Sequence, residues 1–377
     1  MPCIEIKLSK INLPLLFIEK NLSYEGNNNF IFLNKREEVK SFGIQNNQSK
    51  LWNFNLNYFD FINSNSPSIN RDASRKLILK WIKETSNHDG NAWHSYPLSL
   101  RITNWVKWLI INEKNTDIEI YKSLAEQANH LSRNIEWDIM GNHLIANAKG
   151  LIFSGILFEN SIADKWFNQG KKLLTDQLDE QILDDGGHFE RSPMYHSIIL
   201  EDILDLILIL KSSTKYQEDS LIPLLKQYAS RMGFWLKNMS HPDGNISFFN
   251  DCAFDISTSP NRIFAFMDKL NIEVYDKKEK INIMKQSGYI SFDSNACKSI
   301  LDVGLIGPDY IPAHAHADTL SFELSLFSER IIINGGISNY DNSPQRNHER
   351  STRSASTVEV NQINSSDVWS AFRVAKR

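Results

Sequence analysis

The stretch "IPAHAHADTLSFEL" carries the most suggestive spacing of reactive residues in the chain, two histidines one residue apart followed by an aspartate. Side chains at alternate positions of a strand share a face, so an alternating strand would place His314 and His316 together and continue through Leu320 and Phe322. Two imidazoles on one face suit zinc, and Asp318 could complete or orient such a site. The same pair also suits proton transfer, so the motif alone leaves both chemistries open.

A second group of polar residues stands in "DDGGHFERSPMYH". Ser192 is a good N-cap and Pro193 fits the first helical position, which predicts that Tyr195 lies in the first turn of a helix. Exposed N–H groups there favour an anion, such as a phenolate or a ligand carboxylate. The alternative is structural: Tyr195 packs, while His188 and Glu190 cap the loop.

The stretch "MGNHLIANAKGLIFSGILF" places Asn142 and His143 at the start of another helix, where both can donate hydrogen bonds outward. An asparagine N-cap followed by a satisfied histidine is the commoner explanation for such a pair taken alone.

These residues belong to elements that periodicity predicts. From about 70 to 270, apolar positions three and four apart predict at least five helices, in the stretches 75–84, 100–111, 143–158, 199–210 and 224–239. From about 287 the period becomes two, which predicts strands at 289–293, 299–307, 320–327, 330–335 and 356–361. We therefore expect an arm or cap at 1–50, a helical domain at 51–280 and an antiparallel β domain at 281–377. The chain ends in what reads as the middle of that β domain, so we expect the domain to be incomplete.

Composition limits the classes of function. The 377 residues are 41% hydrophobic, enough for a large core, and the net charge of −4 gives no reason to expect a nucleic-acid partner. Cys3, Cys252 and Cys297 are too few and too dispersed for a disulfide framework. The N-terminus has no signal-peptide pattern, and no apolar run is long enough to span a membrane. We expect a cytoplasmic protein as the sequence is written, or a periplasmic one if the start is misassigned.

Six ordered stretches of the chain together resemble the heparinase II/III-like family of polysaccharide lyases: "WHSYPLSLRITNW", "NHLIANAKGLIFSGILF", "DGGHFERSPMYH", "HPDGNISFFND", "HAHADTLSFEL" and "RSTRSASTVEVNQINSSDVWSAFRV". The resemblance covers about residues 50–377. It implies an α+β multidomain fold, an incomplete α/α toroid followed by an antiparallel β-sandwich, with a catalytic cleft between them.

Members of this family cleave uronic-acid-containing polysaccharides by β-elimination, which gives each motif an expected role. The uronate carboxylate must be neutralised before the C5 proton can leave, and Asn142 and His143 match the family's neutralising pair. Tyr195 and His314 match the tyrosine and histidine that serve as base and acid, an exchange of protons that needs no redox cofactor. The resemblance also implies substrate-binding residues: Trp93, Arg101, His188, Glu190, Asn250 and Arg350. The expected partner is an acidic polysaccharide or oligosaccharide.

Some family members hold a structural zinc with the second histidine of the H-x-H pair, an aspartate before a glycine turn and a histidine in the "RST" segment. Here His316 is present, but Asn334 and Ala355 stand at the other two positions. Because an amide and a methyl group cannot replace carboxylate and imidazole, we predict no zinc at this site.

Two other classes of function remain open at this stage. Asp185, Glu190 and Asp251 lie in polar loops and could act as the paired carboxylates of a glycoside hydrolase. Asn334, Ala355 and the abrupt end of the β domain also suit a protein that binds polysaccharide, or serves in assembly, with reduced or no turnover.

Overall fold

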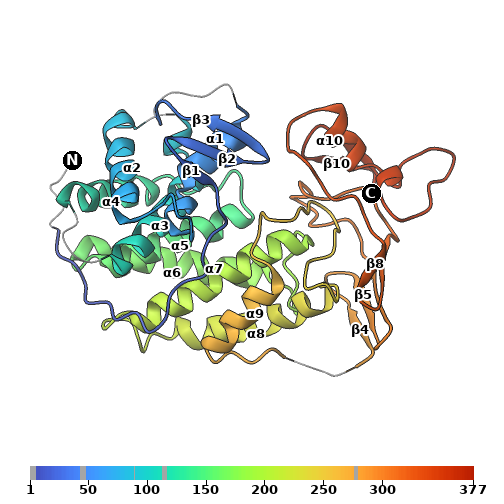
Figure 1. The fold of residues 1–377 in the computed structure, drawn as a ribbon. Helices are drawn as coiled ribbons and strands as arrows, with labels where there is room; N and C mark the ends of the chain where they lie inside the picture. The colour runs from blue at the N-terminus through green and yellow to red at the C-terminus, as the bar shows by residue number, and fades with distance from the viewer. Residues whose placement is uncertain (1–5, 43–47, 89, 113–116, 276–278) are drawn as a thin grey trace. The chain divides into compact units, whose positions relative to one another are not determined.

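The computed structural model describes residues 6–42, 48–88, 90–112, 117–275 and 279–377. The chain forms two compact units. Unit 1 contains residues 1–177 and 205–222, and unit 2 contains residues 178–204 and 223–377. The two units are described in turn (Figure 1).

Unit 1 is mainly helical, with a small antiparallel sheet near its start. The sheet has the strand order β1-β2-β3, formed by Tyr24–Gly26, Asn29–Phe32 and Lys35–Glu38. The α-helices are α1 (Lys50–Tyr58), α2 (Arg71–Glu84), α3 (Ser95–Ile111), α4 (Ile118–Leu131), α5 (Asn142–Leu157) and α6 (Ser161–Gln181), the last of which ends in unit 2. Two 3₁₀ turns, η1 (Asp60–Asn63) and η2 (Asn91–Trp93), precede α2 and α3.

Local sequence explains where the first helices of unit 1 begin and how they pack. The side chains of Ser49 and Asn70 accept hydrogen bonds from the backbone N–H groups of Trp52 and Ala73, which caps α1 and α2. Helices α3 and α5 lie side by side (Figure 1). A Cβ atom at Gly150 would lie 3.2 Å from the Cα of Ser99, so the glycine permits this close approach.

The core of unit 1 is an aromatic cluster. Phe59, Phe61, Trp81 and Trp105 are almost completely buried and pack mainly edge to face, with ring centroids 4.9 to 5.4 Å apart for the pairs Phe59–Phe61, Phe59–Trp105 and Trp81–Trp105. Edge-to-face pairs add to the free energy gained from burial alone. The cluster fixes α2 and α3 against the turn η1.

A buried ionic triad also stabilises unit 1. The Nζ atoms of Lys107 on α3 and Lys149 on α5 each lie 2.5 Å from the Oδ2 atom of Asp205. Burial alone would raise the pKa of Asp205, but the two ammonium charges lower it to about 2. The aspartate is therefore ionised and is the counter-charge that permits two lysines to lie in the interior.

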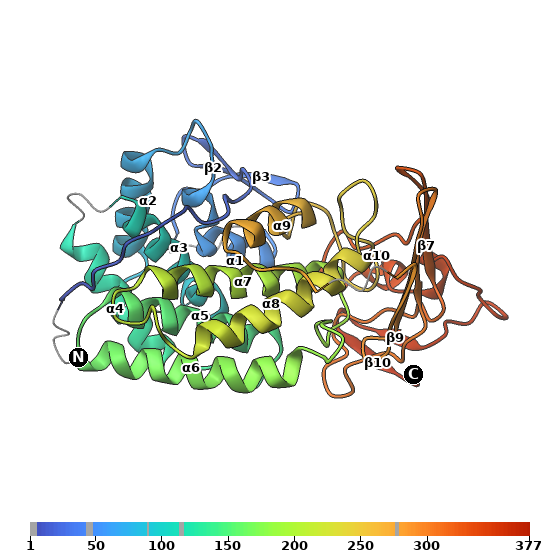
Figure 2. The same cartoon turned by 90° about the horizontal axis from the view of Figure 1, so that it is seen from below.

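Unit 2 combines helices with an antiparallel sheet. Its helices are α7 (Pro193–Ser212), which enters unit 1 after Leu204, α8 (Leu221–Asn238), α9 (Pro260–Lys269) and the short α10 (Pro344–Glu349). The main sheet has the order β4-β5-β6-β7-β8, formed by Ile281–Met284, Tyr289–Asp293, Cys297–Asp302, Phe322–Leu326 and Glu329–Ile332. A separate hairpin pairs β9 (Asp367–Trp369) with β10 (Arg373–Ala375). Figure 2 shows β7, β9 and β10 from below.

Helix α8 and the main sheet share one hydrophobic core. Trp235 of α8 and Met239, which directly follows this helix, are buried together with Met284, Tyr289 and Ile300 from β4, β5 and β6. The turn before α7 packs on the same helix, because Gly186 has a φ of +89° and a Cβ atom there would lie 2.2 Å from the Arg231 carbonyl oxygen. The absence of a side chain at Gly186 therefore allows α8 to approach this turn closely.

The predicted order of helices followed by antiparallel strands is confirmed. All five predicted helical stretches overlap α2, α3, α5, α7 and α8, and four of the five predicted strands overlap β5 to β8. Within the described ranges, no helix combines the length and apolar character needed to cross a membrane.

The strand predicted at 356–361 is wrong. This segment contains only an isolated bridge between Val360 and Ile363, and Val358 is 80% exposed. The N–H of Ser356 donates to the Asn334 side chain and the Thr357 hydroxyl donates to the Thr319 carbonyl oxygen. Side-chain hydrogen bonds therefore hold the segment without a neighbouring strand.

The strand predicted through the two histidines is also wrong, because β7 begins only at Phe322. The backbone turns between Pro312 and Ala315 and again between Asp318 and Ser321, and Leu320 has a φ of +62°. Left-handed backbone at a leucine is incompatible with a continuous strand. The H-x-H pair therefore lies in an irregular segment before the sheet.

Candidate active site in unit 2

Asp251 joins the two histidines of the H-x-H pair. Its Oδ2 atom lies 2.8 Å from Nδ1 of His314, and its Oδ1 atom lies 2.8 Å from Nε2 of His316. Arg346 of α10 donates to both oxygens, at 2.5 Å to Oδ1 and 2.7 Å to Oδ2. Both imidazoles therefore contact one carboxylate, and this contact, not a strand, brings them together.

The surroundings of Asp251 keep it ionised. Burial alone would raise its pKa, but hydrogen bonds from His314 and His316 and the charge of Arg346 hold the pKa of this carboxyl well below its usual range. The bidentate contact with Arg346 is buried and compensates the negative charge. The Asp251 carboxylate accepts a hydrogen bond from Nδ1 of His314 and so fixes the orientation of the ring. In the neutral tautomer that carries its proton on Nδ1, the other ring nitrogen, Nε2, is free of a proton and can accept one.

The backbone around the H-x-H pair is held at several points. Two nitrogens of Arg350 donate to the Ala315 carbonyl oxygen, at 3.1 and 2.9 Å, and the Thr352 hydroxyl donates to the Ala317 carbonyl oxygen. The His316 N–H donates to Oδ1 of Asn250. These bonds replace the strand ladder that the segment lacks, so His314 lies on a fixed loop.

Tyr195 packs against His314. Their ring centroids are 4.0 Å apart and the ring planes are inclined by 29°. Ser192 caps α7 as predicted, because its hydroxyl oxygen accepts a hydrogen bond from the Tyr195 N–H. The same hydroxyl donates to the Asp251 carbonyl oxygen at 2.6 Å. One serine therefore connects the start of the helix that carries Tyr195 to the residue that orients His314.

The phenol of Tyr195 is in contact with a second tyrosine, since its hydroxyl oxygen lies 2.9 Å from that of Tyr340. Burial raises the pKa of Tyr195 well above its usual value, and Tyr340 and the negative charge of Asp251 act in the same direction. Tyr195 is therefore a neutral phenol near neutral pH, with a proton to donate. The ring of Tyr340 lies against Arg346, whose guanidinium carbon is 5.0 Å from the ring centroid.

Two of the predicted substrate-binding residues, Glu190 and His188, lie in the loop before α7. The Oε2 atom of Glu190 lies 3.6 Å from Nε2 of His314. His188 is completely buried and its Nε2 atom lies 3.0 Å from Oε1 of Gln181. Burial lowers the pKa of His188 well below its usual value, so it is a neutral ring inside the unit. The structure thus brings Glu190 to His314, while His188 serves the packing of the loop.

Asn250 and Arg350, also predicted to bind substrate, are bonded to protein groups. Asn250 donates to the Arg191 carbonyl oxygen at 3.0 Å, and its backbone is left-handed with a φ of +60°. Arg350 is fully buried and also donates to the Ser370 carbonyl oxygen. Both residues shape the loops around His314, and their contact with substrate stays a prediction.

Asn142 and His143 lie in unit 1, at the start of α5. Gly141 is the cap residue and Asn142 is the first helical residue, so the N-cap alternative for Asn142 is wrong. The ring of His143 stacks on Tyr96 with centroids 4.2 Å apart, and its Nδ1 atom lies 3.2 Å from Oε2 of Glu136. The contact with Glu136 lies within ion-pair distance but is not a hydrogen bond, unlike the contact of Asp251 with His314.

Trp93 and Arg101 are buried in unit 1. The Nε1 atom of Trp93 donates to the Thr85 carbonyl oxygen at 2.9 Å. The Nε atom of Arg101 donates to Gln127 at 2.9 Å, and its guanidinium carbon lies 3.9 Å from the centroid of the Trp81 ring. These contacts give both residues a part in the core of the unit, and their predicted contact with substrate is untested.

His316 and Asn334 stand at two of the positions where some family members bind zinc, and here both contact other protein groups. His316 is bonded to Asp251, and the Asn334 side chain accepts from Ser356 and lies 3.5 Å from the Ser321 hydroxyl. Among the residues that the structure describes, no group of three or more histidine, cysteine or acidic side chains is placed to hold a metal ion. The absence of zinc remains a prediction.

Two of the three carboxylates considered for a glycoside hydrolase, Asp185 and Asp251, accept hydrogen bonds from protein groups. Asp251 accepts four hydrogen bonds from His314, His316 and Arg346. Asp185 accepts from the N–H and the hydroxyl of Ser287, at 2.8 and 3.0 Å. These contacts do not form the pair of carboxylates that a glycoside hydrolase directs at the glycosidic bond. A hydrolase is therefore not favoured.

Three residues of this site were not assigned to it from the sequence. The sequence indicates Asp251 only as a candidate hydrolase carboxylate, and no pattern in it indicates Arg346 or Tyr340. The signal for Asp251 was its place in "FFND", a polar residue after a buried aromatic run. Arg346 lies 95 positions from Asp251 in the chain, and no local pattern connects residues at that separation.

Comparisons with known proteins show the family of this chain. The family model described as "Heparinase II/III N-terminus" matches residues 40–281, and the model described as "Heparinase II/III-like, C-terminal" matches residues 276–377. The chain is 28% identical over 239 residues to a heparin-sulfate lyase of Bacteroides thetaiotaomicron, which covers 57% of this chain and 34% of that protein. It is 25% identical over 271 residues to a heparin-sulfate lyase of Pedobacter heparinus, with 66% and 40% covered.

The fold is similar to a solved structure described as heparinase III. The TM-score is 0.70 at 18% identity, with 90% of this chain and 59% of that chain covered. At this identity the likeness concerns the fold alone. The chain spans only 34% and 40% of the lengths of the two curated relatives.

Proposed function

Because the chain belongs to the heparinase II/III-like family, we propose that it is a polysaccharide lyase that cleaves a uronic-acid-containing polysaccharide by β-elimination. The observation that carries the proposal is the stacked pair of Tyr195 and His314, in which Asp251 orients the imidazole and Tyr195 keeps its proton. The names of the relatives, heparin-sulfate lyases, support an acidic polysaccharide as substrate. The finer architecture, an incomplete α/α toroid with a β-sandwich, is part of the same proposal.

His314 is the proposed base. With the proton of the neutral ring on Nδ1 and directed to Asp251, the lone pair of Nε2 is available for the C5 proton of the uronate. As the imidazolium forms, the Asp251 carboxylate stabilises its positive charge. Asp251 itself acts through His314, so it is a positioning residue and not a catalytic one.

Tyr195 is the proposed acid. The C5–H bond breaks as His314 takes the proton, its electron pair forms the C4–C5 double bond, and the C4–O4 bond breaks. The departing O4 takes the phenolic proton of Tyr195. The ring contact keeps the tyrosinate next to the imidazolium, so a proton returned from His314 to Tyr195 restores both groups.

Asn142 and His143 are proposed to bind the uronate carboxylate. The C5 proton is weakly acidic while the adjacent carboxylate is fully charged, and hydrogen-bond donors stabilise the enolate-like transition state more than the ground state. An amide N–H and an imidazole N–H at the start of α5 are suitable donors, and the positive end of the helix dipole adds to them.

The test is a panel of uronate polysaccharides incubated with the protein, read by the ultraviolet absorbance of a 4,5-unsaturated product. Absorbance that appears with at least one polymer, and is lost in His314→Ala, is the expected result. Reducing ends released without absorbance would indicate a hydrolase instead. No product from any acidic polymer, with the protein shown to be folded, would contradict the proposal.

A further inference from the structure

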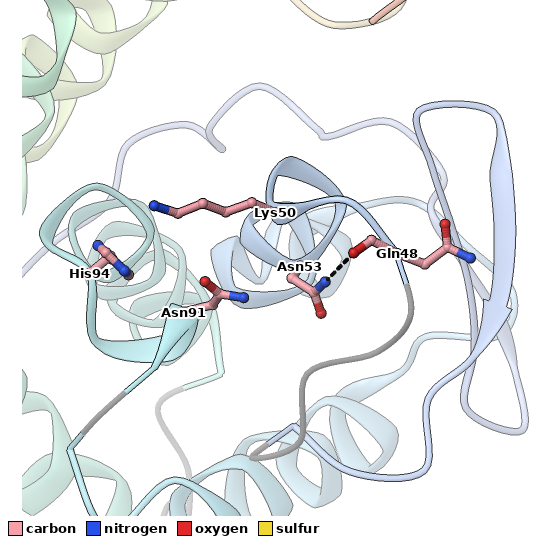
Figure 3. Close-up of a pocket in the computed structure, with 5 residues that line it drawn as sticks. All are labelled: Gln48, Lys50, Asn53, Asn91 and His94. Carbon is pink, nitrogen blue, oxygen red and sulfur yellow. Dashed lines mark hydrogen bonds between the residues drawn. The ribbon is translucent and has the colours of Figure 1, made fainter. Parts of the chain in front are cut away.

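Unit 1 contains a cavity to which the proposed reaction assigns no role. Its volume is about 320 Å³, and it is lined by Gln48, Lys50, Asn53, Asn91 and His94 (Figure 3). Binding pockets for small ligands span about 300 to 1,000 Å³, so this cavity suits a group of the size of one sugar unit. All five lining residues are polar or basic, which suits a hydroxylated ligand better than an apolar one.

The cavity lies where two helices begin. Lys50 is the first residue of α1, and His94 directly precedes α3. Neither helix has an acidic residue in its first turn, and no side chain of the described residues caps α3. Both positive helix ends and the ammonium group of Lys50 therefore favour an anion in this cavity.

Two carboxylates lie near the cavity, but at His94 the positive charge of Lys50 has a larger effect than the negative charge of Glu136. Glu37 accepts a hydrogen bond from the Gln48 side chain at 2.9 Å. Glu136 accepts from Asn147 at 3.2 Å and lies beside Nδ1 of His143. Burial and the charge of Lys50 lower the pKa of His94, so this ring is neutral near neutral pH and can both donate and accept hydrogen bonds.

Side chains converge on the cavity from two segments, residues 48–53 and 91–94. Figure 3 shows Lys50 extending toward His94, and the carboxamide of Asn91 pointing toward Asn53. Asn91 is 8% exposed, and the described part of the chain shows no hydrogen-bond partner for its side chain. A buried amide without a partner is costly unless a ligand or solvent satisfies it.

A flat hydrophobic surface lies beside these polar groups. The centroid of the Phe54 ring lies 5.3 Å from the centroid of the His94 ring and 5.1 Å from the Nζ atom of Lys50. Aromatic faces of this kind pack on the apolar face of a pyranose, while polar groups around them bind its hydroxyls. The combination of ring, amides and ammonium is the chemistry that an acidic sugar requires.

The cavity is close to the proposed carboxylate-binding pair in the same unit. Tyr96, two residues after His94, stacks on His143. Glu136, whose Oε2 atom lies 3.2 Å from Nδ1 of His143, also affects the pKa of His94. A polysaccharide bound at Asn142 and His143 can therefore continue along the unit toward Lys50.

We propose that this cavity is a second sugar-binding subsite, in which Lys50 pairs with the carboxylate or sulfate of an acidic sugar and Asn91 binds a hydroxyl group. The subsite takes a unit of the same polysaccharide that is bound at Asn142 and His143, so in this respect it rests on the proposed function. It contributes to the affinity for longer oligosaccharides and not to the chemical step.

The experiment measures oligosaccharide binding calorimetrically in the Tyr195→Phe background, so that the ligand is not consumed. The ligands are an unsulfated heparan-type hexasaccharide, its N-sulfated form and a neutral hexasaccharide. Lys50→Ala is expected to raise the Kd of the acidic ligands about fivefold, as the loss of a partly exposed ion pair predicts. Lys50→Arg should restore the affinity, and Asn91→Ala should weaken binding of all three ligands.

Lys172→Ala is the matched control, because Lys172 is an exposed lysine of α6 that does not line the cavity. A loss in Lys50→Ala confined to the N-sulfated ligand assigns the anion as sulfate, and an equal loss for both acidic ligands assigns it as carboxylate. Unchanged affinity in Lys50→Ala, an equal loss in Lys172→Ala, or no binding of the acidic ligands to the parent protein would each overturn the subsite.

The two proposals fail separately. If the subsite is wrong, the wild-type protein still releases unsaturated product from a polymer while Lys50→Ala binds as the parent does. If the lyase reaction is wrong, no unsaturated product forms, but the acidic hexasaccharides still bind in a manner that depends on Lys50.

Discussion

The Nδ1 atom of His314 lies 2.8 Å from the Oδ2 atom of Asp251, although the two residues are 63 positions apart in the chain. The contact turns a histidine in an irregular loop into an imidazole of defined orientation. The same aspartate holds His316 and is held by Arg346, so one buried carboxylate organises three side chains.

Asp251→Asn should lower kcat by about 100-fold or more with little change in KM, because a misoriented imidazole loses most of what a positioned base contributes. A fall in kcat with an unchanged KM distinguishes this positioning role from a general disruption of the folded protein. The variant should also be less stable, since Arg346 loses a buried counter-charge, so rates must be compared well below the unfolding temperature. The matched control is Asp243→Asn, which removes a partly exposed partner of Arg330 in the same unit. Equal kcat in Asp251→Asn and the wild type would contradict the proposed orientation of His314.

Tyr195→Phe should lower kcat by about 100- to 10,000-fold, because the phenylalanine ring keeps the contact with His314 but has no proton to donate. The unfolding temperature should change little. Tyr310→Phe provides the control, since Tyr310 is 53% exposed in the same unit and its hydroxyl donates to Glu180. Substantial turnover in Tyr195→Phe would show that another group protonates the leaving oxygen.

Removal of metal ions should leave the protein unchanged. Because Asn334 and Ala355 stand at two of the three positions where some family members bind zinc, a chelator should alter neither the unfolding temperature nor the rate of product formation. Metal analysis of the purified protein should find zinc well below one ion per chain. A fall in the unfolding temperature that zinc reverses would prove this expectation wrong.

Asp205→Asn should lower the free energy of unfolding by about 3 to 5 kcal/mol, because Lys107 and Lys149 would both lose their contact with this buried carboxylate. The pKa of Asp205 is lowered to about 2 in the folded protein from an ordinary value of 3.8. Its contribution is therefore complete above the unfolded pKa and is lost as the pH falls through about 2.

Urea unfolding of wild type and Asp205→Asn, measured from neutral pH down to about pH 2, should show two curves that converge in acid. Asp164→Asn, which removes an exposed partner of Lys215 in the same unit, should cost at most about 1 kcal/mol. A difference between wild type and Asp205→Asn that does not depend on pH would contradict the assignment of the ionised triad.

The sequence by itself determined the order of the elements and the start of α7. Periods of three to four and then of two residues are local properties of the chain, and so are the cap at Ser192 and the proline at position 193. For the same reason the motifs identified Tyr195 and His314 as candidates for proton transfer, and the ordered set of motifs identified the family.

Only the tertiary structure decided how those candidates are held. Alternation predicted a strand through His314 and His316, but Leu320 is left-handed and the segment is fixed by Asp251, Arg350 and Thr352. Ionic and side-chain contacts between residues far apart in the chain leave no periodic trace, because each depends on the folded path of both segments. For the same reason the sequence could not reveal that Arg346 neutralises Asp251, or that Lys50 and Asn91 line one cavity.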